Sequence, residues 1–438
     1  MGNQIRRLDL RGQRLSAAQI RDLLPRASLD ITQAVEQIRP LVEQIRTEGV
    51  PPVLAAAQKY DGFNPEPLLV SKAEIAAAVA ELDQDLRLSI EESIERVRKV
   101  SEATLPKSVT VSLGEGAEVQ QRWQPIESVG LYVPGGRAVY PSSVIMNVLP
   151  AQVAGVSRLV IATPGQKEFA GRPHPTVLAT AGLLGVENVL NVGGPAAIAA
   201  LAYGLPQIDF SPVDLVTGPG NIFVAAAKRL LRGTIGIDSE AGTTEILILA
   251  DETANARLIA YDLVSQAEHD DAAASILVTN SPSLIDSVLS ELALIIPATH
   301  HTERVTTALS GQQSALVLVD DIGEGVEIAN AYATEHLEIM TANNGGVLKS
   351  IKHAGAIFLG DFSPVSLGDY MAGSNHVLPT GSTARFNAGL GVGTFLRAQQ
   401  VINYNEAGLA TIADKIYSFA QAEGLPAHGQ AVTARFSK

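Results

Sequence analysis

The chain has 438 residues, a formal net charge of −14 at pH 7, and a composition that is 46% hydrophobic and 18% charged. Its length predicts two or more domains, and its hydrophobic content is typical of a globular α/β protein and excludes a largely disordered chain. The acidic balance, with no Lys/Arg-rich run against it, argues against nucleic acid or an anionic membrane as a partner.

Residues 1–24 predict a small N-terminal extension. Charged residues and no apolar segment follow Met1, so we expect no signal peptide, and no uninterrupted run of about 18 apolar residues predicts a membrane span. A cytoplasmic protein is therefore expected. The chain has no cysteine, so any metal would have to be held by His, Asp, Glu or Gln.

Between about residue 28 and residue 105, apolar residues recur at the spacing of amphipathic helices. Residues 109–119 then alternate in polarity, with glycines at 114 and 116, and predict a pair of strands joined by a turn. The first of the helical stripes consists of Ile31, Ala34, Val35, Ile38, Leu41, Val42 and Ile45.

From residue 124 onward, short β-branched runs alternate with Ala-rich stretches, which is typical of parallel sheets with helical crossovers. We therefore expect an α/β fold of two Rossmann-like parallel-sheet modules. One domain would be residues 130–245, on the side of a nucleotide cofactor, and the other would combine 25–129 with 246–390. Residues 391–438 would form a C-terminal helical tail, and the family resemblance given below implies that this tail and the N-terminal extension serve dimerisation. The strand-like runs are 129–133, 159–162, 188–192 and 215–217 in one module, and 246–249, 274–278, 315–319 and 355–359 in the other.

Glycine-rich turns follow three of the predicted strands, at 133–136, 192–194 and 217–221, and each leads into an Ala-rich helix. Such turns bind phosphate groups at the carboxyl ends of parallel strands, although they can also serve only as tight connections. The usual Gly-x-Gly-x-x-Gly does not follow a strand. Its nearest approximation, Gly389 to Gly393, lies late in the chain and is interpreted as a flexible connection.

The segment Ser265-Gln-Ala-Glu-His-Asp270 contains a candidate for half of a metal site. Gln266 and His269 are three residues apart and share one face of the predicted helix. A single histidine is more often solvated or structural than a ligand, so the remainder of the set has to come from elsewhere. Asp369, and His428 close to Glu423, would complete an N₂O₂ set suited to Zn²⁺, with Mn²⁺ or Co²⁺ as substitutes. Spacing alone does not select these residues.

Glu335 and His336 stand side by side after Tyr332 and form a candidate acid/base pair, although Thr334 could instead cap a helix there. Another polar segment, residues 368–380, includes Asp369 and His376. We expect it to bind a ligand because such a segment is costly to order without one.

The sequence resembles the histidinol dehydrogenase family over nearly the whole chain, from about residue 30 to the end, and seven blocks between residues 129 and 428 carry the resemblance. They include a strand and turn with the helix start after it, the TGPGN turn, the two blocks around His269 and His336, and two late polar blocks. The blocks are VGLYVPGGR (129–137) with YPSSVIMN (140–147), NVGG (191–194), TGPGNIFVAAAKR (217–229), SQAEHD (265–270), NAYATEHLEI (330–339), GDYMAGSNHVLPT (368–380) and AEGLPAH (422–428).

The resemblance implies oxidation of L-histidinol through the aldehyde to L-histidine, with two NAD⁺ and one Zn²⁺ per site, at the end of histidine biosynthesis. It implies a homodimer in which Glu423 and His428 are supplied to the partner's site. By the family motifs, catalysis falls to Glu335 and His336, NAD⁺ contact to Tyr132 and Asn221, and zinc ligation to Gln266, His269, Asp369 and His428. Substrate contact falls to Thr244, Gln266, His269, His336, Asp369, Glu423 and His428.

Two departures from the family pattern bear on these expectations. Thr243-Thr244 stand where the family often has Pro-Ser, so the hydroxyl is kept but a rigid proline is lost. Pro195-Ala196 stand where the family has Ala-Gln, so one NAD⁺ contact is absent. The competing interpretations are an NAD-dependent dehydrogenase of another small alcohol, a zinc hydrolase that uses Glu335, and a binding protein without catalysis.

Overall fold

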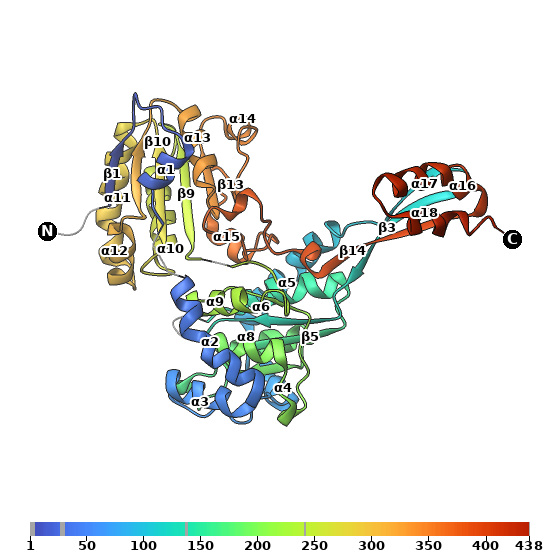
Figure 1. Ribbon diagram of the computed structural model, residues 1–438. Helices are drawn as coiled ribbons and strands as arrows, with labels where there is room; N and C mark the ends of the chain where they lie inside the picture. The colour runs from blue at the N-terminus through green and yellow to red at the C-terminus, as the bar shows by residue number, and fades with distance from the viewer. Residues whose placement is uncertain (1–4, 27–30, 136–138, 241, 438) are drawn as a thin grey trace.

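The computed structural model describes residues 5–26, 31–135, 139–240 and 242–437, and it divides them into two lobes and a projecting arm (Figure 1). The six-stranded lobe is built on one parallel sheet in the order β1-β11-β10-β9-β12-β13. Its central strands have apolar side chains on both faces, as expected for a sheet covered by helices on two sides. The strands are β1 (Arg6–Asp9), β9 (Glu245–Ala250), β10 (Ala274–Thr279), β11 (Ala315–Leu318), β12 (His336–Met340) and β13 (Ala356–Leu359).

Helices cover both faces of this sheet. One face packs against α10 (Ala256–Ala267), α11 (Pro282–Ile295), α12 (Thr302–Ser310) and the start of α15 (Val365–Tyr370). The other face packs against α1 (Ala17–Leu23) and α13 (Ile322–Tyr332). The lobe is completed by η3 (Ile296–Ala298) and α14 (Asn344–Leu348).

The five-stranded lobe holds a second parallel sheet, in the order β6-β5-β4-β7-β8. The chain starts at the central strand, moves outward to β6, and returns to β7 on the other side of β4. The carboxyl ends of β4 and β7 therefore flank the point where the strand order reverses, the usual ligand position in such sheets. The strands are β4 (Ser128–Tyr132), β5 (Arg158–Thr163), β6 (Val189–Asn191), β7 (Leu215–Thr217) and β8 (Gly236–Ile237).

Eight helices sandwich the five-stranded sheet in two apolar layers. One layer contains α2 (Ile31–Glu48), α3 (Val50–Tyr60), α8 (Gly194–Tyr203) and α9 (Ile222–Leu231). The other contains α4 (Lys72–Glu81), α5 (Gln84–Ala103), α6 (Pro141–Ala154) and α7 (Pro175–Leu183). Short turns complete the lobe and the return from the other lobe, namely η1 (Lys167–Phe169), η2 (Pro206–Ile208), η4 (Thr383–Arg385) and η5 (Val392–Phe395).

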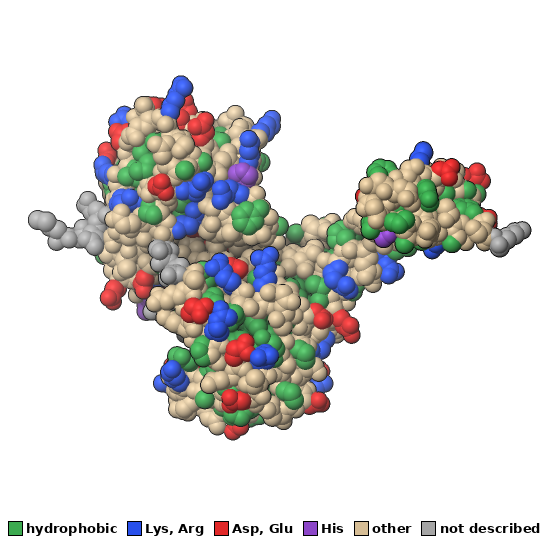
Figure 2. All heavy atoms as spheres, in the orientation of Figure 1, with side chains coloured by type: hydrophobic (Ala, Val, Ile, Leu, Met, Phe, Trp, Pro, Cys, Tyr) green, Lys and Arg blue, Asp and Glu red, His purple; other side chains and the backbone are tan. Residues whose placement is uncertain are grey.

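The arm is an antiparallel three-stranded sheet that carries three short helices, and it stands clear of both lobes (Figure 2). Several large apolar side chains on it are exposed, including Ile402 and Phe419 at 71% and 73%. An isolated domain rarely leaves so much apolar surface in water, so this surface is a candidate contact face. The arm consists of β2 (Val109–Gly114), β3 (Ala117–Pro125), β14 (Leu396–Tyr404), α16 (Glu406–Ala410), α17 (Ala413–Ala422) and α18 (Pro426–Thr433).

The two parallel sheets confirm the α/β expectation, and the strand pair at 109–119 is present. The packing groups other segments differently from the expected domains. Helices α2–α5 cover the sheet of β4–β8, so residues 31–103 do not join 246–390. The N-terminal segment adds β1 to the edge of the six-stranded sheet, and the C-terminal tail contributes the strand β14. Among the described residues, no helix has the length and apolar character needed to cross a membrane.

Candidate active site

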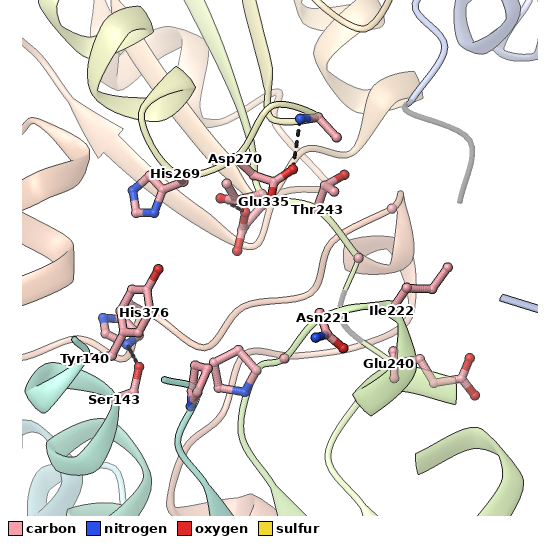
Figure 3. A pocket seen from close by; sticks show the side chains of 18 of the residues that line it. Tyr140, Ser143, Asn221, Ile222, Glu240, Thr243, His269, Asp270, Glu335 and His376 are labelled. Carbon is pink, nitrogen blue, oxygen red and sulfur yellow. Dashed lines mark hydrogen bonds between the residues drawn. The ribbon is translucent and has the colours of Figure 1, made fainter. Parts of the chain in front are cut away.

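A pocket of about 820 Å³ lies between the two lobes (Figure 3). From the six-stranded lobe it receives Thr244, His269, Glu335, His336 and Asp369. The five-stranded lobe contributes the start of α6 and the turn before α9, and the connecting segment after α15 contributes His376. Most of the residues predicted for catalysis and metal binding therefore meet at this one cavity, although they come from distant parts of the chain.

The candidate acid/base pair lies at the amino end of β12. Helix α13 ends at Tyr332, and Ala333 then adopts the left-handed conformation with φ of 50°, which turns the chain into the strand. The segment Thr334–His336 is buried, and Glu335 and His336 line the pocket. The alternative in which Thr334 caps a helix is therefore wrong, because a strand begins at His336.

The Glu335 carboxyl is held by two donors from the start of the neighbouring strand. Its Oε2 accepts hydrogen bonds from Thr244 Oγ1 at 2.5 Å and from the backbone N–H of Glu245 at 3.0 Å. Burial raises the pKa of Glu335 to about 8, because the loss of hydration outweighs these donors. The group is therefore mostly protonated at neutral pH and becomes a base above about pH 8.

His336 is buried beside this carboxyl, with Nδ1 3.5 Å from Glu335 Oε2 and 3.2 Å from the backbone oxygen of Glu245. Burial lowers the pKa of His336 to about 4, so the ring is neutral at physiological pH. A carbonyl oxygen can only accept, so Nδ1 carries the ring proton and donates it to Glu245. The lone pair is then on Nε2, where the ring can take a proton from a bound molecule.

A hydrogen-bond chain connects this pair to the helix predicted to carry metal ligands. Gln266, buried near the end of α10, donates from Nε2 to Thr244 Oγ1 at 2.6 Å, and Thr244 Oγ1 in turn donates to Glu335. The hydroxyl expected at position 244 is thus in use. The bond occupies the amide nitrogen of Gln266 and leaves its carbonyl oxygen Oε1 for a ligand.

His269 and Asp369 reach the same pocket, at the ends of α10 and α15. His376 lies against Asp369: its Nδ1 donates to the backbone oxygen of Asp369 at 3.0 Å, and its Nε2 is 3.3 Å from Ser143 Oγ. Burial lowers the pKa of His376. Within the described part of the chain, no three His, Asp or Glu side chains are grouped closely enough to hold a metal ion.

The remaining two predicted residues, Glu423 and His428, do not lie in this pocket. Both are exposed on the arm, Glu423 at the end of α17 and His428 in α18. Figure 1 shows these helices far from the space between the lobes of the same chain. A single chain therefore brings together Gln266, His269 and Asp369 but not His428.

A second pocket, of about 390 Å³, lies at the carboxyl edge of the five-stranded sheet and shares Asn221 with the first. Tyr132 lines it, and its hydroxyl accepts a hydrogen bond from the backbone N–H of Gly194 at 3.0 Å. Burial raises the pKa of Tyr132 to about 12. Ala196 lies in the wall, where the family glutamine is missing. Gly136 and Arg137, part of the first glycine turn and its block, lie outside the described residues.

The glycine turn at 217–221 is held by an ion pair at the far end of α9. Lys228 Nζ contacts Asp238 Oδ1 at 2.5 Å and also donates to the backbone oxygen of Gly218, while Asp238 Oδ2 accepts the Gly218 N–H. Both side chains are buried, so the pair is protected from water. Asn221 follows this turn and caps α9, accepting from the backbone N–H groups of Phe223 and Val224.

Sequence reasoning missed Arg26, which supports the acid/base pair from behind. Its guanidinium binds both carboxyl oxygens of the buried Glu245, at 2.5 and 3.0 Å, and lies over the Tyr332 ring. Glu245 provides the backbone atoms that bond Glu335 and His336. An acidic residue at the start of a fully buried strand is the signal that could have pointed to a buried cation, but not to which one.

Comparisons with known proteins agree with this geometry. A family model described as histidinol dehydrogenase matches residues 24–436. The chain is 54% identical over 438 residues to histidinol dehydrogenase of Thermobifida fusca, covering 100% of this chain and 99% of that protein. The chain belongs to the histidinol dehydrogenase family.

Other comparisons extend the match. Histidinol dehydrogenase of Mycobacterium tuberculosis is 52% identical over 435 residues, covering 99% of this chain and 98% of that protein. The crystal structure of histidinol dehydrogenase from Elizabethkingia anophelis superposes with a TM-score of 0.91 at 30% identity, covering 100% of this chain and 98% of that one. As a member of the histidinol dehydrogenase family the chain is an enzyme, an oxidoreductase.

Proposed function

We propose that this enzyme oxidises L-histidinol through the aldehyde to L-histidine, with two NAD⁺ and one Zn²⁺ per site, at the end of histidine biosynthesis in the cytoplasm. The observation that carries the proposal is a neutral, buried His336 beside Glu335, facing the glycine-turn edge of a second parallel sheet across one pocket. A base that faces the carboxyl edge of a parallel sheet, the edge where such sheets generally bind nucleotides, supports the proposal.

The donor set fits the metal in chemistry, and a single chain provides only part of it. Gln266 Oε1, a nitrogen of His269 and the carboxylate of Asp369 are ligand types that Zn²⁺ accepts. His428 would complete the set only from another copy of the chain, since the helix that carries it, α18, stands far from the space between the lobes (Figure 1). When bound, Zn²⁺ would hold the imidazole and amino nitrogens of the substrate.

The partner of the chain is therefore proposed to be a second copy in a homodimer. The arm, with its exposed apolar side chains, would cross to the other protomer and deliver Glu423 and His428. Glu423 would contact the ammonium group or the imidazole N–H of the substrate. The acidic balance and the lack of a basic run argue against nucleic acid and anionic membranes as partners, because both attract cationic proteins.

NAD⁺, bound across the two pockets with Tyr132 and Asn221 in contact, would supply the hydride acceptor. In the first half-reaction His336 Nε2 takes the hydroxyl proton of the alcohol as the carbon-bound hydrogen leaves as hydride. The aldehyde then adds water, and Glu335, once ionised, takes a proton from that water. The resulting hydrate anion, RCH(OH)O⁻, would lose a second hydride to a second NAD⁺ and its remaining hydroxyl proton to solvent, which gives the carboxylate, with Thr244 holding the Glu335 oxygen in place throughout.

The deciding experiment measures NADH formed per L-histidinol consumed by the purified, zinc-loaded enzyme. Two equivalents, with L-histidine as product, support the proposal. One equivalent with aldehyde release would indicate a dehydrogenase that stops at the aldehyde. Turnover of other small alcohols but not of L-histidinol would place the specificity elsewhere, and ester or amide hydrolysis without NADH would support a zinc hydrolase.

A further inference from the structure

Two carboxyl groups that no step of the proposed reaction uses lie in contact inside the six-stranded lobe. Glu338 belongs to β12 and is 0% exposed. Asp262 belongs to α10, which covers that face of the sheet, and its carboxyl group is the neighbour that Glu338 faces closely enough for each to shift the pKa of the other. A buried acid pair is costly unless it is organised by other contacts.

A hydrogen bond between two carboxyl groups requires a proton on one of them. Burial, and then the neighbouring Asp262, raises the pKa of Glu338 well above its ordinary value, while burial raises that of Asp262 to about 6. Glu338 Oε2 is buried and receives no hydrogen bond from a donor among the described residues. A proton on Glu338, donated to the Asp262 carboxylate, satisfies this oxygen, so the pair has one negative charge at neutral pH.

The second oxygen of Glu338 brings in a third element. Its Oε1 accepts a hydrogen bond at 3.1 Å from the backbone N–H of Val365, the first residue of α15. Glu338 therefore fastens both α10 and α15 to β12. The three elements pack against each other on one face of the sheet, where Val365 and the apolar residues of α10 share a core.

Each of these three contacting residues lies a few positions along its own helix or strand from a residue of the proposed site. Asp262 is one helical turn before Gln266 on α10, and His269 follows the end of that helix. Glu338 is two residues after His336 and on the same face of β12. Val365 is one helical turn before Asp369. The pair thus joins the three elements at similar distances from Gln266, His336 and Asp369.

We propose that Asp262 and Glu338 are positioning residues that set the spacing of the proposed metal ligands, Gln266 and His269 on α10 and Asp369 on α15, relative to the acid/base pair on β12. This inference rests on the proposed function for the roles of those residues. A partner that orients ligands from behind in this way changes metal affinity or activity by about 10–100-fold when it is replaced.

The test compares Glu338→Gln with Glu338→Met in the full-length enzyme. Glutamine reproduces the protonated carboxyl, because its amide donates to Asp262 and its carbonyl accepts from Val365. Methionine has a similar volume but makes neither bond. Three quantities are measured for each protein: Zn²⁺ affinity by competition with a chromogenic chelator, hydrogen exchange of the Val365 amide, and the melting temperature.

Glu338→Met is expected to weaken Zn²⁺ binding about 10–100-fold and to speed exchange at Val365. Its melting temperature should not fall in parallel, because an apolar side chain replaces a buried acid. Glu338→Gln is expected to remain within about twofold of the wild type in affinity and exchange. Glu327→Met, at an exposed glutamate of α13 on the opposite face of the sheet, is the matched control.

Unchanged affinity and exchange in Glu338→Met would overturn the proposal, and so would an affinity loss that merely follows the melting temperature or that Glu338→Gln shares in full. Whether the proposed function itself is wrong is tested separately, on the wild-type enzyme. If the wild-type enzyme binds no Zn²⁺ or does not oxidise L-histidinol, the function is wrong, and exchange at Val365 still decides whether the carboxyl pair holds α15.

Discussion

The two lobes meet the pocket with opposite ends of their sheets. The five-stranded lobe presents the carboxyl ends of β4 and β7 with their glycine turns, and the starts of α6, α8 and α9. The six-stranded lobe presents the amino ends of β9 and β12 and the ends of α10 and α15. Although both lobes are parallel α/β sheets, they therefore offer different chemistry to the same cavity.

The ends of the helices explain why the two lobes offer different chemistry. Helix N-termini favour anions, so the five-stranded lobe is suited to the phosphates of a dinucleotide. Helix C-termini favour cations, so the six-stranded lobe is suited to a metal ion and an ammonium-bearing substrate. Glu335 and His336, the acid and base whose pKa values burial shifts at this pocket, belong to the six-stranded lobe. Variants in the six-stranded lobe should therefore change the chemical steps, and variants in the five-stranded lobe should change cofactor binding.

The largest effect is expected from His336→Asn. Removal of the proton acceptor should lower kcat for alcohol oxidation by about 10²–10⁴-fold, while Zn²⁺ content stays close to that of the wild type. Steady-state NADH formation and metal analysis of the purified protein measure the two quantities. His353→Asn, in the loop before β13, controls for the substitution itself. Loss of zinc in His336→Asn would show that the separation between base and ligand is wrong.

Complementation between chains should restore the formation of L-histidine from two variants that each fail to form it, because each site would use the arm of the other chain. After equal mixing and reassembly of His428→Ala and Glu335→Gln, about a quarter of the wild-type activity is expected, since half of the dimers are mixed and each has one intact site. Glu335→Gln mixed with His336→Asn provides the control, because both changes lie in the same lobe and no intact site forms. Absence of recovery in verified mixed dimers would refute the exchanged arm.

Glu335→Gln should separate the two half-reactions. The first hydride transfer uses His336 and should survive, so NADH should stop near one equivalent per L-histidinol. In the wild type, the rate of aldehyde oxidation should increase as the pH rises through about 8, where Glu335 loses its proton. At lower pH the raised pKa keeps Glu335 protonated, so it cannot act as a base and the rate should fall. Single-turnover rates with the aldehyde measure this profile. A rate independent of pH across that range would remove Glu335 from the water-activating role.

Much of this arrangement could be predicted from the sequence. The β-branched runs predicted both parallel sheets because strands buried on two faces have near-continuous apolar sequence. The structure places Gln266, of the SQAEHD block, against Thr244, and it places Glu335 beside His336 in the ATEHLE block, while the roles of these residues stay predictions. The sheets could be predicted because each strand depends on local order along the chain.

The remainder depends on packing that a local pattern does not contain. The stripe from Ile31 to Ile45 shows that α2 has a buried face, but the same stripe fits either sheet, and the assignment to the six-stranded lobe was wrong. Arg26 supports Glu245 from 219 positions away. Asp262 and Glu338 would each pass for an ordinary surface acid in sequence, and only their burial against one another distinguishes them.

The smallest effect is expected in the five-stranded lobe, from Ala196→Gln. A glutamine at the start of α8 would face the second pocket and could add one hydrogen bond to NAD⁺, worth about 0.5–1.5 kcal/mol. That gain corresponds to an affinity for NAD⁺ about 2–10-fold higher. Because nothing in the six-stranded lobe changes, kcat should remain within about twofold while KM for NAD⁺ falls.

Ala55→Gln, on an exposed position of α3 in the same lobe, is the matched control for the longer side chain. If KM for NAD⁺ falls in Ala196→Gln alone, the second pocket is the cofactor side and the chemistry of the other lobe is independent of it. If Ala196→Gln instead leaves KM for NAD⁺ unchanged and lowers kcat, the second pocket is coupled to the first through Asn221, the residue that both pockets share. The division between a binding lobe and a chemical lobe would then no longer hold.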